Sequence, residues 1–354
     1  MDISKLQPES FNHIQSIVEK NRIGNAYLIN GPSGSGKEAF ALTFGSLITG
    51  VEIESFINNP NIFLILPGDS EFYKNLFKSS KMDEKEYVEW KNYWREKLLF
   101  PLKKKKISNS KRIPINVLKN LKKNIFFKSD HRKVVIIFDA HALSEGSAES
   151  ANALLKILEE PPNNTSFILV SESINQVVPT IASRCQTINM PRIESKNLHD
   201  LLDRKNNFDA ETISFLSNNN LNKIDLLDEY SKESILDIVN KYIHAIQYDT
   251  PESVALFSED MILNFSSKRE RFHFELNIIK KWLECTLLIQ ETISLPFDWD
   301  NFTDLGEDFL SKNSNSRILD LLKEIEICLN NLKGNSAPKL AIMNMIINSH
   351  NSLN

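Results

Sequence analysis

Cysteine is scarce in this chain of 354 residues, which contains only Cys185, Cys285 and Cys328. These three residues lie far apart and form no CxxC spacing. A secreted disulfide scaffold or a zinc knuckle needs more cysteines at closer spacing. We therefore expect a reducing, cytoplasmic environment and no structural metal.

Long apolar runs and an excess of one charge are also lacking. No stretch approaches the roughly eighteen apolar residues that span a bilayer, and Met1–Lys5 lacks the apolar run of a signal peptide. The formal net charge is only −4, so any contact with nucleic acid must come from a local patch. Hydrophobic residues make up 41% and charged residues 25%, which together with the length predicts a globular protein of two or three domains without a membrane span.

Three short apolar runs predict the strands of an α/β domain. They cover residues 26–29, 134–138 and 166–170, and they are separated by segments with helical spacing of apolar residues, such as 148–160. The runs do not alternate between apolar and polar residues, which is typical of parallel strands covered on both faces. The sequence therefore predicts a doubly wound α/β domain that extends to about residue 190.

After Pro191 the pattern changes to apolar residues spaced three and four apart, and no further buried strand is expected. We predict an α/β domain over residues 1–192, a small helical domain over 193–243 and a helical C-terminal domain over 244–354.

A glycine-rich loop follows the first predicted strand and fits the pattern G-x-x-x-x-G-K. Its candidate phosphate-binding residues are Gly31, Gly34, Ser35, Gly36 and Lys37. Glycines let successive backbone N–H groups converge on phosphate oxygens at a helix N-terminus, and the lysine neutralises the β and γ charges. A strand-to-helix turn without a ligand is the alternative, and the flanking strand and helix favour the phosphate loop.

Two positions of this pattern depart from a hydrolytic site. Glu38 stands where a Ser or Thr hydroxyl would hold Mg²⁺, and its carboxylate about 4 Å from a phosphate would cost roughly 4 kcal/mol at an effective dielectric of 20. An acid there also suits the positive end of the helix dipole. Asp139, after the second predicted strand, keeps the Mg²⁺-binding acid, but Ala140 replaces the acid that orients water. The sequence thus argues against bound ATP and Mg²⁺, and we expect no cofactor.

Over most of its length the chain resembles the delta-prime subunit family of the bacterial DNA polymerase III clamp loader. The matching stretches are Asn25–Leu28, Ala151–Pro162 and Pro179–Gln186. The family usually has His where Asn25 stands. Many members carry a four-cysteine zinc module between the loop and the second strand, and here residues 71–110 take its place without any cysteine.

The resemblance implies a RecA-like AAA+ domain, a small helical lid and an all-α collar domain. It implies a non-catalytic component of a polymerase holoenzyme that joins delta and gamma/tau subunits in a hetero-pentamer and helps to load a sliding clamp onto primed DNA. Arg184 would reach, in trans, the γ-phosphate held by a neighbour. Ser171 would be the polar γ-phosphate sensor, and Lys223 matches the lid's sensor arginine.

Each of these residues also has a purely structural interpretation. Arg184 alone could be a surface arginine, Ser171 could form a strand-end turn, and Lys223 could be a solvated helix lysine. From residue 102 to 133 there are twelve Lys or Arg against one acid, including Lys103–Lys106, which could contact DNA or form a solvated loop. An active AAA+ ATPase of replication or repair and a DNA-binding module built on this basic segment remain alternative functions.

Overall fold

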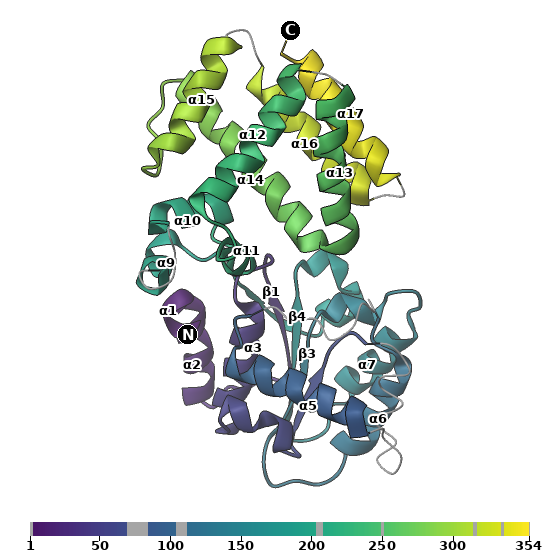
Figure 1. Cartoon of the computed structure of the whole chain (residues 1–354). Coiled ribbons are helices and arrows are strands. Elements are labelled where there is room, and N and C mark those ends of the chain that lie inside the picture. The colour runs from purple at the N-terminus through teal and green to yellow at the C-terminus, as the bar shows by residue number, and fades with distance from the viewer. Residues whose placement is uncertain are drawn as a thin grey trace. The chain divides into compact units, whose positions relative to one another are not determined.

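The computed structural model describes residues 3–68, 84–103, 112–202, 208–248, 251–313, 317–333 and 336–353. The chain folds into two compact units, Met1–Asn197 with Asn220–Asn222 and Leu198–Asn219 with Lys223–Asn354. The first unit contains the sheet, and the described residues of the second form helices without a strand (Figure 1). No helix among the described residues is long and apolar enough to cross a membrane.

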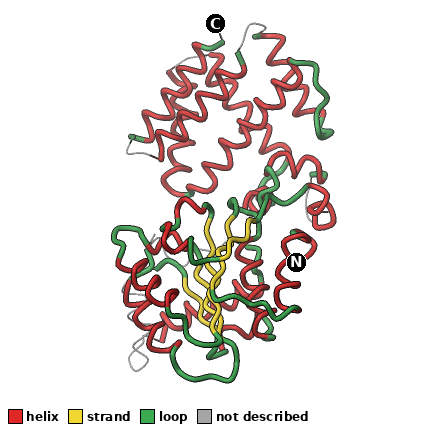
Figure 2. Tube along the Cα trace, turned by 180° about the vertical axis from the view of Figure 1, so that it is seen from behind, coloured by secondary structure: helices red, strands yellow, loops and turns green. Residues whose placement is uncertain are grey.

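The first unit is built on a five-stranded parallel sheet, which confirms the predicted α/β class. The strands are β1 Ala26–Asn30, β2 Ile62–Ile65, β3 Lys133–Ile137, β4 Thr165–Ser171 and β5 Gln186–Asn189. They are ordered β2-β3-β4-β1-β5, and Figure 2 shows them side by side within this unit. β1 thus lies between β4 and β5, so the loop that follows it leaves the sheet beside the end of β4.

Helices cover both faces of this sheet. The helices of the unit are α1 Ile3–Leu6, α2 Pro8–Glu19, α3 Lys37–Thr49, α5 Glu84–Leu99, α6 Ile115–Ile125, α7 Glu149–Glu159 and α8 Pro179–Ala182, with short 3₁₀ turns η1 Ile53–Asn58, η2 Ala140–Leu143 and η3 Ile174–Gln176. Leu28, Val135 and Phe167 face the core that α6, α7 and α8 cover. On the opposite face α3 packs through Gly45, close to Ile136. Strands covered on both faces explain the absence of alternation in the sequence.

The second unit is helical, as the spacing after residue 191 predicts. α9 Ser195–Leu202 begins in the first unit, and α11 Leu221–Leu227 also belongs to both. The remaining helices are α10 Ala210–Ser217, α12 Lys232–Tyr248, α13 Pro251–Ser267, α14 Arg269–Gln290, α15 Asp300–Lys312, α16 Ile318–Lys333 and α17 Pro338–Asn351. α12 runs through residue 243, where the lid was predicted to end, and the division into three domains stays a prediction.

Candidate functional site

The glycine-rich loop joins β1 to α3, as its sequence predicts. Gly34 and Gly36 have φ values of +75° and +81°, in the left-handed region that glycine adopts without a steric penalty. Gly31 donates its N–H to the carbonyl of Ser171 at 3.2 Å, so the loop begins against the end of β4. The loop therefore has the strand-turn-helix setting of a phosphate-binding loop.

The lysine of this loop contacts the protein itself. Lys37 is buried, and its ammonium donates to the carbonyl of Pro32 at 3.2 Å. The same ammonium lies 3.9 Å from a carboxylate oxygen of Glu172, which follows β4. A lysine that serves nucleotide would reach the β and γ phosphates. In this structure the neighbouring acid partly neutralises its charge.

Glu38 forms an ion pair that the sequence did not reveal. One carboxylate oxygen lies 2.5 Å from the ammonium of Lys97, near the end of α5. The Lys97 side chain is only 2% exposed, and its ammonium also donates to the carbonyls of Lys103 at 2.7 Å and Pro101 at 3.2 Å. An ammonium has three N–H donors, and three oxygen atoms accept from this one. The residue that stands in place of the Mg²⁺-binding hydroxyl, Glu38, thus binds the ammonium of Lys97.

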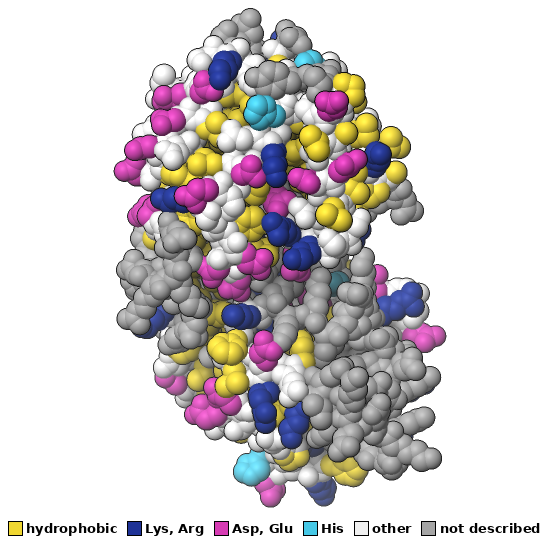
Figure 3. Space-filling view, viewed as in Figure 1, with side chains coloured by type: hydrophobic (Ala, Val, Ile, Leu, Met, Phe, Trp, Pro, Cys, Tyr) yellow, Lys and Arg dark blue, Asp and Glu magenta, His cyan; other side chains and the backbone are white. Residues whose placement is uncertain are grey.

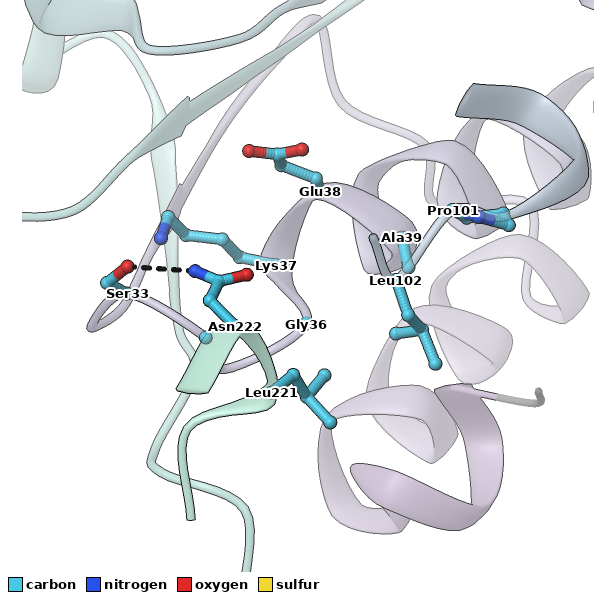
Figure 4. A pocket seen from close by; sticks show the side chains of 10 residues that line it. Ser33, Gly36, Lys37, Glu38, Ala39, Pro101, Leu102, Leu221 and Asn222 are labelled. Carbon is cyan, nitrogen blue, oxygen red and sulfur yellow. Dashed lines mark hydrogen bonds between the residues drawn. The ribbon is translucent and has the colours of Figure 1, made fainter. Parts of the chain in front are cut away.

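The space around the start of α3 is nearly filled. Figure 4 shows Leu102, Leu221 and Asn222 gathered around the loop, and the amide of Asn222 donates to the Ser33 hydroxyl at 3.1 Å. The remaining cavity has a volume of about 20 Å³. A water molecule needs roughly 10–15 Å³ measured in this way, so about one water fits. A triphosphate with its metal does not fit this cavity.

The two loop glycines face other residues instead of an open cradle. A Cβ atom on Gly34 would lie 2.0 Å from the side-chain oxygen of Asn220. A Cβ atom on Gly36 would lie 2.7 Å from Ile3 of α1 and 3.5 Å from Leu102. The backbone thus approaches neighbouring residues from the N-terminus, from the segment after α5 and from the start of α11.

The remaining predicted positions are Asp139, Ser171 and Lys223. Asp139 follows β3 with a left-handed backbone (φ 48°), and Ala140 is buried at the start of η2. Ser171 is fully buried, and its hydroxyl donates to the carbonyl of Ser173 at 3.0 Å, which is the geometry of a strand-end turn. Lys223 lies in the second unit, where its ammonium contacts the side-chain oxygen of Asn277. Their roles as nucleotide sensors stay predictions.

Arg184 lies between α8 and β5 on the surface of the first unit. Its guanidinium donates to the carbonyl of Thr180 at 3.0 Å and to a carboxylate oxygen of Glu159 at 2.8 Å. The two paired side chains are 37% and 44% exposed. Arg184 is therefore held in a defined position but remains accessible to a neighbouring molecule.

Cys285 and Cys328 are buried, and Cys185 is half-buried. Within the described ranges, no group of three or more His, Cys, Asp or Glu side chains could hold a metal ion. Burial raises the pKa of Cys185 and of Cys285 to about 12, and that of Cys328 to about 11. Thiols with such pKa values stay protonated and are poor metal ligands. The absence of zinc nevertheless stays a prediction.

Part of the basic segment is visible in the structure. Lys119, Lys122 and Lys123 of α6 are exposed, whereas Lys104–Lys106 and residues 71–83 and 107–110 lie outside the described residues. On the face shown in Figure 3, the described Lys and Arg side chains are dispersed among acidic ones and form no continuous field. A role of this segment in binding DNA stays a prediction.

A family model described as DNA polymerase III, delta subunit, matches residues 6–194. Among curated proteins, the chain is 24% identical to the delta' subunit of DNA polymerase III from Bacillus subtilis, over 78% of this chain and 75% of that protein. It is 29% identical to the delta' subunit from Buchnera aphidicola subsp. Baizongia pistaciae, over 50% and 48% of the two chains. It is 26% identical to the gamma subunit from Buchnera aphidicola subsp. Schizaphis graminum, over 55% and 52%.

Among solved structures, a DNA polymerase III gamma subunit-related protein from Thermotoga maritima aligns with 98% of this chain and 100% of its own length, with a TM-score of 0.48 and 16% identity. For the curated relatives, the alignments span about half the length of the two Buchnera proteins and three quarters of the Bacillus protein.

Proposed function

Because the chain belongs to the family described as DNA polymerase III, delta subunit, we propose that it is the delta-prime-type subunit of a bacterial clamp loader. The match covers residues 6–194, which include the sheet, the glycine-rich loop and Arg184. Relatives named delta' and gamma align with 50–78% of this chain, which supports a place in the same kind of complex. The subunit acts with delta and gamma/tau subunits in a hetero-pentamer that opens a sliding clamp and places it on primed DNA.

In this role the subunit hydrolyses no ATP. The ion pair between Glu38 and Lys97 carries this part of the proposal, because it removes the position from which a hydroxyl would hold Mg²⁺. Ala140 supplies no group to orient the attacking water, and the cavity lined by Lys37 and Glu38 at the start of α3 holds about one water. This chain's contribution to catalysis must therefore come from a residue on its surface.

Arg184 is that residue. A guanidinium is always charged, and its fork of N–H donors fits phosphate oxygens. Its ion pair with Glu159 is exposed at both ends, and exposed pairs are worth only roughly 0.2–1 kcal/mol. A neighbouring subunit's γ-phosphate can therefore replace Glu159 at small cost. An arginine supplied in trans is worth about 10³–10⁵ in rate where it has been measured.

Reconstitution tests the proposal. The purified full-length chain is mixed with delta and gamma/tau subunits, the product is sized, and the loading of a sliding clamp onto primed DNA is followed with and without this chain. We expect one stable complex containing this chain, and loading that depends on it.

Lys37→Ala in this chain is the matched control, because the proposal gives Lys37 no nucleotide to bind and loading should be unchanged. A chain that stays outside the complex, or loading that proceeds equally well without it, would contradict the clamp-loader role. An ATPase of the isolated chain that Lys37→Ala abolishes would instead identify an active ATPase.

A further inference from the structure

The segment Lys97–Lys103 lies against the glycine-rich loop, and no property of the loop itself requires it. We propose that this segment is an internal occupant of the phosphate site, in which the Lys97 ammonium takes the place of the metal cation and Leu102 fills space beside the loop. The inference deepens the proposed function, on which it rests for the expectation that nucleotide is absent. It assigns a task to part of residues 71–110, which the sequence alone leaves without one.

The surroundings of the Lys97 ammonium resemble those of a bound cation. The carboxylate of Glu38 and the carbonyls of Pro101 and Lys103 all accept from it, at 2.5, 3.2 and 2.7 Å. Both carbonyls belong to the turn that follows α5, so the chain wraps around the charge that it supplies. Mg²⁺ also takes oxygen ligands, so the ammonium occupies the kind of surroundings that stabilise a cation.

Ordinary core packing does not account for this arrangement. A buried lysine costs several kcal/mol of desolvation, and apolar residues of similar volume often serve at least as well in its place. Lys97 is charged although Trp94 and Leu98 of the same helix are buried and apolar. The buried charge of Lys97 is favourable only because the carboxylate of Glu38 lies beside it at the start of α3. The ion pair thus accounts both for the buried lysine and for the acid in the glycine-rich loop's helix.

The apolar part of the segment closes the remaining space. Leu102 lies beside Gly36, which also faces Leu221 and Ile3. The cavity that these residues leave holds about one water. On α5, Trp94 packs against Phe138 with ring centroids 5.8 Å apart, which fixes α5 next to the end of β3. The loop is consequently held in one conformation without nucleotide.

Hydrogen exchange and nucleotide binding on the isolated full-length chain test this proposal. Leu102→Ala should speed amide exchange in residues 33–38 about tenfold, because local opening becomes easier. Leu99→Ala is the matched control, since Leu99 is 52% exposed at the end of α5 and does not line the cavity beside the loop. With a fluorescent ATP analogue and Mg²⁺, the wild type should show no binding up to about 1 mM, and the triple variant Glu38→Thr, Lys97→Ala, Leu102→Ala should bind at least tenfold more tightly.

Thermal unfolding of a single and a double variant covers the case in which the triple variant does not fold. Lys97→Met alone leaves Glu38 without its partner and should lower Tm by on the order of 10 °C, whereas Glu38→Gln with Lys97→Met should lose clearly less. Equal losses in the two variants, or equal exchange in Leu102→Ala and Leu99→Ala, would overturn the proposal, as would Mg²⁺-dependent binding of the analogue by the wild type. Because no partner subunit is present, a failure to assemble a loader would count against the proposed function and leave these results unaffected.

Discussion

Replacing Arg184 by alanine should separate a role in a neighbour's site from a role in this chain's own stability. In the free chain the guanidinium has two contacts, one to Glu159 and one to the carbonyl of Thr180. The ion pair is exposed at both ends, so its loss costs roughly 0.2–1 kcal/mol. For a unit of this size that corresponds to a fall in Tm of at most about 4 °C. We therefore expect Arg184→Ala to fold and to enter the complex normally.

The effect on turnover should be far larger than the effect on stability. An arginine that completes a neighbour's site is worth about 10³ or more, or roughly 4 kcal/mol in the activation free energy. Phosphate release by the affected interface should fall by at least an order of magnitude even when other interfaces keep their own arginines. Arg184→Lys should restore little, because an ammonium keeps the charge and loses the fork of donors.

The assay follows clamp loading and DNA-stimulated phosphate release by the assembled complex, with assembly confirmed by sizing. Two controls accompany it. Arg22→Ala removes an exposed arginine elsewhere in the first unit and should change nothing. Glu159→Gln weakens the resting contact of Arg184 without removing the guanidinium, and loading should stay within about fivefold of the wild type. Wild-type loading by an assembled Arg184→Ala complex would refute the role in trans.

Four further outcomes are expected. The isolated chain should hydrolyse ATP no faster than buffer, and Lys37→Ala should not change that rate, as a phosphate-release assay will check. Elemental analysis of the purified protein should find no stoichiometric zinc. Because burial raises the pKa of Cys185 and Cys285 to about 12, only about 10⁻⁴ of each thiol is ionised near pH 8, and alkylation of the native protein should be far slower than after unfolding. Burial acts to raise the pKa of Asp209, but hydrogen bonds from Thr212 outweigh it and hold that pKa below the usual value of 3.8. Asp209→Ala should therefore lower the free energy of unfolding at neutral pH by about 1 kcal/mol, and denaturant titrations should show this difference shrinking as the pH falls below 3.8 through the folded-state pKa.

The sequence predicted the central strands because they are buried on both faces. The predicted runs at 26–29, 134–138 and 166–170 correspond to β1, β3 and β4, each within a residue at either end of the run. The two edge strands were not predicted. β5 reads Gln-Thr-Ile-Asn with only Ile188 buried, and β2 is a four-residue strand whose central residues are half-buried. Edge strands have one partner and a weaker hydrophobic signal, so pairing with a neighbour defines them more than composition does.

Only those features of the candidate site that depend on neighbouring residues in the sequence could be predicted. The turn of Gly34 and Gly36 depends on neighbouring residues, and the sequence displays it directly. The contacts of Lys97 and Leu102 depend on how a distant helix returns to the loop. A lysine in a helix is usually solvated, and nothing in its spacing distinguishes Lys97 from Lys91. The departure at Glu38 was visible, but its partner could be identified only in three dimensions.

The close approach of Asn220 to Gly34 affects how mutations in this loop should be read. A side chain at position 34 would collide with an amide from the start of α11 at 2.0 Å, with no phosphate involved. The left-handed backbone and the packing both require glycine there, so its presence in a sequence is no sign that nucleotide is bound. A genetic screen could display this directly. A smaller residue at Asn220 should suppress lesions at Gly34 only in part, because the φ of +75° and the backbone nitrogen of Leu221, 2.8 Å from the same Cβ position, still disfavour any side chain there.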